Sequence, residues 1–538
     1  MPMASHGRAS AIIGAGTLVS RLTGLLRSVV LVAVVGLTGS QVANAFATAN
    51  LLPTNIYELL AAGVITGIIV PQIVRAAQHR DGGNAYISKL MTLGTVLLIV
   101  ATAVVMAIAP LLIWLLTPGY TPEQQALTLA LAYWCLPQLL FYGLYALVGE
   151  VLNARRVFGP YSWAPTVNNI VSIAGFGVFL LVFGGPITQV ADWEPAMTTL
   201  LGVTATLGIA LQAAILAFFW RRTGLRLRLD FGWRGMGLRH LGTLGFWTFL
   251  TVVAGQLAGF VQQAVMSTST DESGFVVFTY AWLIFMLPHS IVAMSISTSY
   301  FTQLAEEVAQ GRGDLVGANL DQSIRALSIF AVGFTVAIGA ASVPIARIFA
   351  TTAPDAVILA VNVCAFLVAL VPFGILVLVR RAFFAFHDTR TPFWFTVVQA
   401  VLAVVGALAA FAASTAGILP LALLTSAVAL AQSLSMFVQL PLALRMLRRH
   451  TGPLSLAPTW RALGRFIIAA VPALIAGVVV FMLTGGTTGW TVQDRLTGIL
   501  GAALVGGVAL LVYVGALALL RAPELDAALR GIRRIAGR

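Results

Sequence analysis

Residues 90–117 read LMTLGTVLLIVATAVVMAIAPLLIWLLT, a run that contains no charged side chain. Crossing about 30 Å of hydrocarbon takes roughly 20 apolar residues in a helix, so this run is long enough to span a membrane. The rest of the chain has the same character, because 59% of its 538 residues are hydrophobic and 9% are charged. A water-soluble fold needs more charged surface than that, and the sequence therefore predicts an all-α polytopic membrane protein.

Charged or Gly- and Pro-rich breaks divide the chain into apolar segments, which we expect to form about fourteen transmembrane helices. These segments are residues 10–37, 43–75, 90–117, 124–152, 161–184, 197–220, 240–268, 275–304, 323–350, 356–385, 392–415, 418–444, 463–484 and 497–520. None of the predicted outer loops is long enough for a folded extracytoplasmic domain.

The positive residues fall on one side of this topology. If the N-terminus is cytosolic, the even-numbered connections and both tails hold 27 of the 31 Lys and Arg residues, all except Arg21, Arg27, Arg347 and Arg495. By the positive-inside rule, both termini are expected in the cytosol. The net charge of +13 reflects this asymmetry and gives no indication of nucleic-acid binding. The first span is too long for the apolar region of a signal peptide and is interrupted by arginines, so we expect it to be retained.

An internal repeat recurs at an offset near 232 residues. The sequences GPYSW at 159–163 and TPFW at 391–394 each open a span and follow a cytosolic Arg pair, and Pro53 and Pro288 fall in corresponding spans. The offset contains six spans, an even number, so the two copies have the same orientation in the membrane.

The repeat predicts two six-helix lobes followed by two extra helices. The expected parts are a first lobe at 1–220, a basic cytosolic linker at 221–239, a second lobe at 240–450, two further transmembrane helices within 451–521 and a basic cytosolic tail at 522–538. Two parallel-repeat lobes with a cleft between them favour an alternating-access transporter over a channel or an intramembrane enzyme.

Several missing motifs argue against catalysis and cofactors. Lys89 is the only lysine and lies in Ser-Lys-Leu, so the chain has no Walker A motif. No HExxH or GxSxG sequence occurs, and no paired carboxylates are expected at a common depth. Cys135 and Cys364 lie far apart within apolar segments, which argues against a disulfide or a metal site. We expect a transporter without a cofactor.

Two arginines within the first span are the strongest candidates for a binding site. Arg21 and Arg27 lie in the sequence SRLTGLLRS at 20–28, about 9 Å apart along a helix and about 120° apart around it. Each is costly in lipid, so both are expected to face a polar cavity or a partner. An extended polyanion such as a pyrophosphate-sugar headgroup fits this spacing better than one small ion. Ser20 belongs to the same polar stretch, and Gly24 leaves room for close approach. Snorkelling or helix tying is the alternative.

The second span offers further polar candidates. Glu58 has the same predicted depth as Arg27, which predicts an ion pair between them and leaves Arg21 as the better anion ligand. Asn44 and Asn50 contribute polar groups that either contact substrate or form hydrogen bonds between helices. The interhelical interpretation is favoured for the remaining buried amides, namely Asn168, Asn169, Gln256, Gln262, Gln263 and Gln399.

Proline and glycine residues predict hinges in two spans. Pro53, Gly63 and Gly67 make the second span bendable, and Pro288 does the same for the eighth. His289, beside Pro288, is a candidate for titration or anion binding, although a lone membrane histidine is more often a packing residue. No acidic residue occurs between Asp388 and Asp494, which weakens any carboxylate site for Na⁺ or H⁺ in spans eleven to thirteen.

The chain resembles the MurJ/MviN family of lipid II flippases in the MOP exporter superfamily. The resemblance rests on several motifs in register across about residues 10–520, which are Ser20-Arg21-x2-Gly24-x2-Arg27, Gly63-x7-Pro71, Leu152-Asn153-x4-Phe158-x5-Ala164-Pro165-x2-Asn168 and Phe384-Ala385-x2-Asp388-x2-Thr391-Pro392. It implies the superfamily's V-shaped fold, a bacterial plasma-membrane location and a central cationic cavity to which Arg21 and Arg27 contribute. The implied cargo is undecaprenyl-pyrophosphate-linked disaccharide-pentapeptide, moved from the inner to the outer leaflet for peptidoglycan synthesis.

This sequence departs from the family pattern at several cavity positions. Asn44 replaces an acid, Tyr57 replaces an arginine and Ala62 replaces a second acid, whose role Glu58 takes over from one turn away. The family's Asp-Arg-x2-Glu cluster in the eighth span falls on residues 282–286, which are apolar, so His289 is the nearest basic replacement.

Three other functions stay open at this point. They are a multidrug or cation antiporter of the same fold, a flippase for another polyprenyl-linked glycan and a scaffold for cell-wall synthesis and division proteins. A cation antiporter needs intramembrane acids, whereas the first lobe offers two arginines against one glutamate near mid-membrane. The expected partners are the glycolipid cargo and membrane lipids, with wall-synthesis and division proteins as further candidates.

Overall fold

The computed structural model describes residues 3–62, 83–232, 242–312 and 315–535. The chain forms two compact units, residues 1–271 and 272–538, and each is described by itself. In the described residues the secondary structure is helical, apart from one isolated bridge between Leu37 and Gly39. The predicted all-α class is confirmed.

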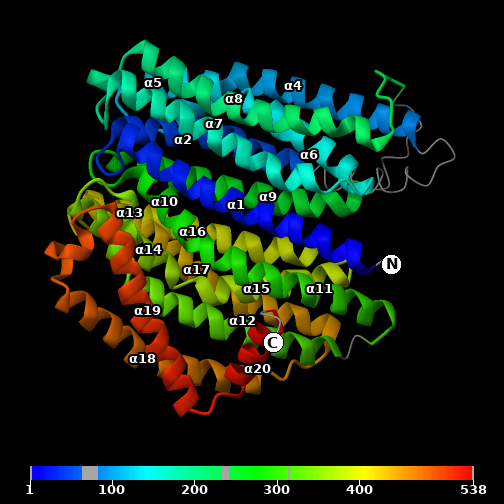
Figure 1. Cartoon of the computed structure of the whole chain (residues 1–538), viewed down its shortest axis with the longest axis vertical. Helices are drawn as coiled ribbons and strands as arrows, with labels where there is room; N and C mark the ends of the chain where they lie inside the picture. The colour runs from blue at the N-terminus through cyan, green and yellow to red at the C-terminus, as the bar shows by residue number, and fades with distance from the viewer. Residues whose placement is uncertain (1–2, 63–82, 233–241, 313–314, 536–538) are drawn as a thin grey trace. The chain divides into compact units, whose positions relative to one another are not determined.

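Unit 1 consists of long helices connected by short turns (Figure 1). Its α-helices are α1 (Met3–Val35), α2 (Gln41–Leu60), α4 (Asn84–Leu116), α5 (Pro122–Cys135), α6 (Gln138–Ala154), α7 (Gly159–Phe183), α8 (Pro195–Phe219) and α9 (Gly242–Met266). Short 3-10 helices lie at η2 (Val190–Asp192), η3 (Trp220–Thr223) and η5 (Ser267–Ser269). Helix α7 packs between α1 and α8, and α2 packs against α5.

Unit 2 has the same kind of architecture and additional helices at its C-terminal end. Its α-helices are α10 (Gly274–Pro288), α11 (Met294–Ala309), α12 (Leu315–Ala340), α13 (Ser342–Phe349), α14 (Ala353–Leu367), α15 (Leu370–Ala385), α16 (Arg390–Thr415), α17 (Leu424–Thr451), α18 (Ala457–Leu483), α19 (Arg495–Leu519) and α20 (Pro523–Ile535). A π-helix, η6 (His289–Ala293), joins α10 to α11, and 3-10 turns lie at η7 (Leu421–Leu423), η8 (Gly486–Thr488) and η9 (Trp490–Val492). Helices α18 and α19 pack side by side and also contact α12.

Eleven helices of the described residues are long and apolar enough to cross a membrane, or twelve if the bent pair α13 and α14 forms one span. The expected count of about fourteen is not confirmed. Several segments expected to be single helices are broken: 124–152 at Leu136-Pro137, 275–304 at η6 and 356–385 at Val368-Ala369. Hydropathy measures apolar length, and it does not detect a break whose residues are themselves apolar.

The two units share their pattern of breaks. Helices α5 and α6 are separated by residues 136–137, and α14 and α15 by residues 368–369, an offset close to the repeat. The α6 and α15 helices also end alike. Arg156 and His387 adopt left-handed backbone conformations, and the next amides, of Val157 and Asp388, return to the carbonyls of Leu152 and Phe383. This arrangement is the Schellman cap.

The contact-defined units do not follow the repeat at every helix. Helix α9, the first helix of the expected second lobe, packs against α2 and α4 of unit 1. Helices α18 and α19 belong to unit 2. Unit 1 therefore contains one helix, α9, beyond the expected first lobe, and unit 2 contains α18, α19 and α20 beyond the expected second lobe.

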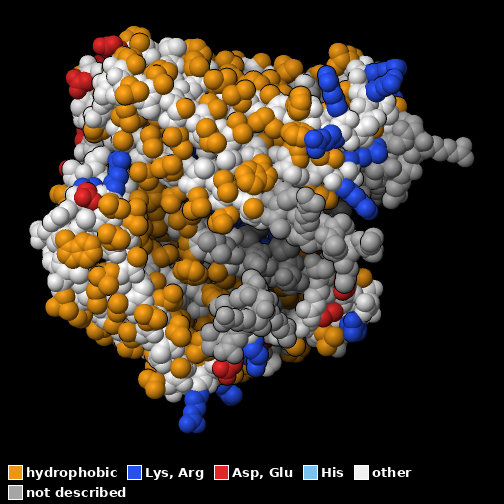
Figure 2. All heavy atoms as spheres, viewed as in Figure 1, with side chains coloured by type: hydrophobic (Ala, Val, Ile, Leu, Met, Phe, Trp, Pro, Cys, Tyr) orange, Lys and Arg blue, Asp and Glu red, His pale blue; other side chains and the backbone are white. Residues whose placement is uncertain are grey.

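The surface of unit 1 matches a membrane-spanning bundle. Hydrophobic side chains cover the face of its long helices, with Lys and Arg gathered at one end and acidic side chains at the other (Figure 2). Apolar residues on this surface are strongly exposed, with Leu181 at 88% and Phe218 at 72%. Such exposure is stable in lipid rather than in water.

Candidate functional site

The polar face of α1 is held against α7 by one amide. The Nδ2 atom of Asn169 donates to the Ser20 carbonyl at 2.9 Å and to the Thr23 hydroxyl at 3.1 Å. A Cβ added at Gly24 would lie 3.4 Å from the same Asn169 nitrogen. The space beside Gly24, expected to admit a ligand, is therefore occupied by α7. The interhelical interpretation of Asn169 is confirmed.

The two arginines of α1 have different surroundings. Arg21 is exposed and Arg27 is half-buried. Arg27 interacts electrostatically with the hydroxyl of Tyr142 on α6, which is also hydrogen-bonded to Thr54 on α2. The rings of Tyr142 and Tyr57 lie 5.8 Å apart. Arg27 thus lies beside a tyrosine cluster formed by Tyr57 and Tyr142, which the sequence alone did not identify as a group.

The expected Arg27–Glu58 ion pair is absent from the described part of the chain. The Nε2 atom of Gln256 on α9 instead donates to Glu58 Oε2 at 2.8 Å. Equal depth fixes only the height of two residues, whereas the direction of each side chain around its helix decides whether they meet. Glu58 faces α9, and this link between α2 and α9 confirms that Gln256 forms a hydrogen bond between helices.

Two carboxylates lie near the tyrosines Tyr57 and Tyr142. Both Glu58 and the half-buried Glu150 of α6 interact electrostatically with Tyr57. Glu150 lies near the end of its helix, four residues before Ala154, and within the apolar segment expected at 124–152. The region around Arg27 therefore contains both signs of charge.

Asn44 and Asn50 occupy different environments. Asn44 is fully buried, and its Nδ2 atom donates to the Ser40 carbonyl at 2.8 Å, so it supports the first turn of α2. Asn50 is half-buried and accepts from Gln138 Nε2 at 3.3 Å. Gln138 begins α6 immediately after the break in this span, and its Nε2 atom also lies 3.3 Å from the Thr206 hydroxyl. Of the two, only Asn50 is partly exposed.

The proposed hinge residues are only partly within the described residues. Pro53 is buried inside α2, and Pro288 ends α10 immediately before the π-helix η6. Gly63 and Gly67 lie outside the residues that the structure describes. A second amide on α9, Gln263, donates to Thr48 of α2 at 3.0 Å, so α2 and α9 are joined on both sides of Pro53.

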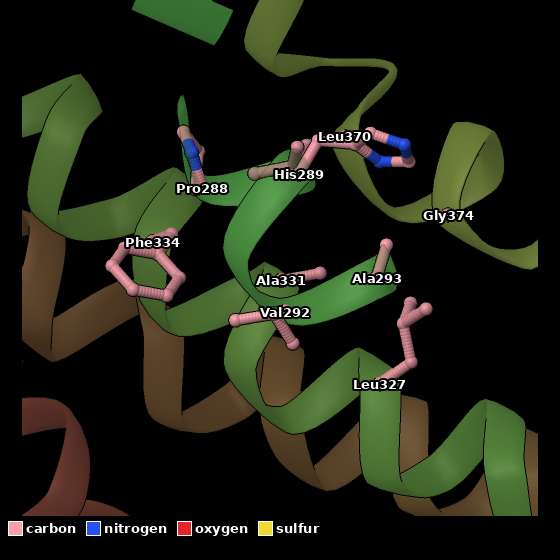
Figure 3. A pocket seen from close by; sticks show the side chains of 9 residues that line it. All are labelled: Pro288, His289, Val292, Ala293, Leu327, Ala331, Phe334, Leu370 and Gly374. Carbon is pink, nitrogen blue, oxygen red and sulfur yellow. The ribbon is translucent and has the colours of Figure 1, made fainter. Parts of the chain in front are cut away.

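His289 lies inside unit 2. It is 5% exposed, and its ring lies 4.4 Å from that of Phe373 on α15. Figure 3 shows its imidazole directed toward α15, beside a small pocket lined by Leu370 and Gly374 among others. The structure therefore gives His289 an apolar enclosure instead of a polar surface.

Comparison with known proteins identifies related chains. A family model described as lipid II flippase MurJ matches residues 35–501. The probable lipid II flippase MurJ of Rickettsia prowazekii is 24% identical over 405 residues, which cover 73% of this chain and 76% of the relative. The protein of the same name from Vibrio cholerae is 23% identical over 531 residues, covering 94% and 95%.

Solved structures show the same fold. A lipid II flippase MurJ in an inward closed conformation matches with a TM-score of 0.69 and 20% identity, covering 93% of this chain and 98% of the other. An inward-facing multidrug resistance MATE transporter of the MOP superfamily matches with a TM-score of 0.64 and 17% identity, covering 80% and 95%. The MOP fold that the family resemblance implies is confirmed.

Proposed function

The chain belongs to the lipid II flippase MurJ family, and we propose that it carries lipid II from the inner to the outer leaflet of a bacterial plasma membrane by alternating access. In this proposal both termini are cytosolic, the protein is a transporter without catalytic activity, and wall-synthesis and division proteins are its additional partners. The basic end of unit 1 then faces the cytosol, as the positive-inside rule requires.

The observation that carries the proposal is the pair of arginines on a helix otherwise suited to lipid. Arg21 is exposed on α1, and Arg27 lies one to two turns further along beside Tyr142. A pyrophosphate leaving water needs charge-assisted hydrogen bonds, and guanidinium groups provide them in a bidentate geometry. Arg21 and Arg27 are the proposed pyrophosphate ligands.

Neutral and acidic groups near the arginines suit the sugar and peptide parts of the cargo. Asn50 and the exposed Glu58 lie on α2, the helix that carries Thr54 beside Tyr142. Amides and carboxylates accept hydrogen bonds from sugar hydroxyls. Ser20 and Gly24 act indirectly, by fixing α1 against Asn169. Asn44 takes no part in this binding site because it is fully buried. The bends at Pro53, Gly63, Gly67 and Pro288 are the proposed hinges.

A cation or multidrug antiporter is the second candidate, because Glu58 and Glu150 lie near a tyrosine cluster. Acidic and aromatic groups together favour organic cations. A flippase for another polyprenyl-pyrophosphate glycan would use the same arginines, so the cargo has to be identified by experiment.

Depletion in the native host separates these functions. A lipid II flippase predicts that lipid II accumulates in the inner leaflet, while another lipid-linked glycan accumulates if that glycan is the cargo. Accumulation of neither, together with increased sensitivity to cationic drugs, would favour the antiporter and overturn the proposal. Reconstituted vesicles loaded with lipid II, read by an impermeant enzyme that modifies only outward-facing cargo, then test transport directly.

A further inference from the structure

His289 begins the π-helix that interrupts the eighth predicted span. Helix α10 runs from Gly274 to Pro288, and η6 covers His289–Ala293. Fifteen helical residues extend about 22 Å, so His289 lies deep within the span. Single π-turns inside helices are uncommon and frequently mark functional sites. The position therefore combines a proline, a π-turn and an ionisable side chain.

The imidazole of His289 is enclosed and incompletely hydrogen-bonded. The residue is 5% exposed, and its Nδ1 atom is buried without a hydrogen-bond partner. The ring packs on Phe373, and the adjacent pocket is lined by apolar side chains that include Val292, Ala331 and Phe334 (Figure 3). A buried polar atom without a partner is rare in folded proteins and calls for a reason.

No charged group lines this pocket. His289 is the one titratable residue among those that line it in the described chain. The π-helix packs against α10, α11, α12 and α15. The titratable residues on these four helices are Tyr280, Tyr300, Glu306, Glu307, Asp321, Arg325, Arg380 and Arg381. None of them lines the pocket, and His289 forms no ion pair in the described residues, so the pocket gives it no counter-ion.

Burial and the absence of a counter-ion make protonation depend on conformation. An imidazolium in this pocket would lose its hydration without gaining an ionic partner, so the structure holds the neutral ring. Protonation becomes favourable only when water enters between η6, α12 and α15. Pro288 and the π-turn lack regular helical hydrogen bonding, so this segment can rearrange at lower cost than a continuous helix.

We propose that His289 is a proton-binding site that couples a proton gradient to the opening of the η6 segment during transport. Nδ1 takes a proton from water that enters the opened pocket. The proton returns to water before the pocket closes and excludes that water. This inference rests on the proposed flippase function, and it adds a driving ion that acts in unit 2.

Reconstituted vesicles test the coupling. With the membrane potential clamped at zero by K⁺ and valinomycin, an outside-acidic pH difference should accelerate cargo flipping by the wild-type protein. His289→Gln and His289→Asn, which cannot be protonated in this range, should flip at one rate with and without the pH difference. His450→Gln is the matched control, since His450 is partly exposed at the end of α17, and it should keep the response. An unchanged response in both His289 variants would overturn the proposal.

A second measurement does not depend on the cargo. A cysteine at the pocket-lining Ala331, with Cys135 and Cys364 replaced by alanine, reports whether water and a small thiol reagent enter. The readout is the ratio of its labelling rate to that of the same cysteine in a His289→Gln background. This ratio should rise by up to about tenfold for each unit that the pH falls, because it follows the fraction of His289 that is protonated. Equal pH profiles in the two backgrounds would overturn the proton site. A normal pH effect on labelling without any flipping would instead overturn the flippase assignment.

Discussion

Arg21 and Arg27 differ in what surrounds them, and that difference predicts different mutant phenotypes. Arg21 is exposed on α1, so replacing it by alanine should leave insertion and accumulation unchanged while transport is lost. The physical reason is that a pyrophosphate crossing about 30 Å of hydrocarbon needs a desolvated cationic ligand. Arg21→Lys should restore transport only in part, because an ammonium lacks the bidentate geometry of a guanidinium.

The measurement for Arg21 is growth of a strain with no native copy, together with membrane protein level. Gly14→Ala on the same helix is a suitable control, since nothing lies within 4 Å of a Cβ added there. Normal growth of the Arg21→Ala strain would remove this residue from the binding site.

Asp388 predicts a pH dependence at the N-terminal end of α16. Its Oδ1 atom accepts from the amides of Arg390 and Thr391 at 3.0 and 2.9 Å, and its Oδ2 atom lies 2.9 Å from His450 Nε2. Burial alone would raise the pKa of the Asp388 carboxyl, but the hydrogen bonds from Thr391 and His450 outweigh burial and lower the pKa below its ordinary value of 3.8.

A carboxyl whose pKa is lowered on folding stabilises the folded state above its ordinary value, and that stabilisation is lost as the pH falls through the lowered pKa. Asp388→Ala should therefore lower the thermal unfolding midpoint at pH 7, by an amount equivalent to about 1 kcal/mol for loss of a cap. The difference from wild type should shrink below pH 3.8. Glu123→Gln, an exposed first-turn acid on α5, controls for general charge effects. A difference that stays constant with pH would contradict this role for Asp388.

At single residues, the sequence did not predict the direction in which a side chain points from its helix. Composition and periodicity placed Arg21, Arg27, Glu58 and His289 within spans and at approximate depths. They gave no rotation about each helix axis, so Glu58 was assigned to Arg27 instead of Gln256. Interhelical amides were more predictable because a buried amide in lipid has to find a partner, as Gln399 does with Ser435 at 3.2 Å.

At the scale of elements, the basic linker is fastened to α4 by a row of side chains. Asn84, Ser88 and Thr92 accept from the backbone amides of Arg226, Arg228 and Asp230 at 2.7, 3.3 and 3.1 Å. Four residues of a helix rise about 6 Å and two residues of an extended chain about 6.6 Å, so the two spacings match.

This match predicts that Ser88→Ala with Thr92→Val releases the linker, at a cost of about 1 kcal/mol for each lost hydrogen bond. Amide hydrogen exchange at residues 226–230 should become faster while exchange within α4 stays slow. Thr102→Val is the matched control, because Thr102 bonds only within its own helix, to the Leu98 carbonyl at 2.7 Å. Unchanged exchange at 226–230 in the double variant would show that other contacts hold the linker.

Helix α20 is attached to unit 2 by one buried carboxylate. Glu524 contacts Arg325 Nη1 at 3.4 Å and Arg465 Nη2 at 3.2 Å, and its side chain is 7% exposed. Arg325 also pairs with Asp321, whose Oδ1 atom accepts from the Thr459 hydroxyl at 2.6 Å. Helices α12, α18 and α20 therefore share one charged cluster.

Glu524→Ala should detach α20, because both arginines can rehydrate whereas the helix loses its ionic anchor. Because both arginines are partly exposed, the free-energy cost of losing these ion pairs should exceed that of a surface pair, which is about 1 kcal/mol. It should stay below the cost of losing a fully buried pair. Trypsin should cut more rapidly after Arg530, with the remaining chain intact. Asp526→Ala, which removes an exposed acid from the same turn, should leave cleavage unchanged. Equal cleavage in both variants would mean that α20 is held by its apolar face.

The sequence predicted where the helical segments lie, but it did not predict the breaks within them. Each of the fourteen apolar segments contains helix in the structure, because apolar length decides whether a segment enters lipid. The breaks at Leu136-Pro137 and Val368-Ala369 were missed because their residues are as apolar as the helices they separate. Their recurrence in both units was nevertheless implicit in the repeat, since copies of one six-span sequence inherit one backbone.

For the whole molecule, composition and charge asymmetry were enough to predict a polytopic all-α membrane protein. The repeat predicted two lobes of the same orientation, and the family resemblance implied the MOP architecture, which solved structures with TM-scores of 0.69 and 0.64 share. Neither property specifies the driving force of transport, because the fold is common to flippases and to multidrug transporters. The driving force has to follow from the charge of the cargo and from the ligands that the chain offers.

That reasoning predicts that flipping responds to membrane potential more strongly than to a Na⁺ gradient. The ionised pyrophosphate is anionic, and an inside-negative potential favours its outward movement by about 2.3 kcal/mol per charge per 100 mV across the full field. The sequence between Asp388 and Asp494 has no acid with which to bind Na⁺. Vesicles with equal pH on both sides and an imposed K⁺-diffusion potential separate this effect from protonation of His289. Flipping that ignores the potential but stops when choline replaces Na⁺ would show that transport is coupled to Na⁺ instead.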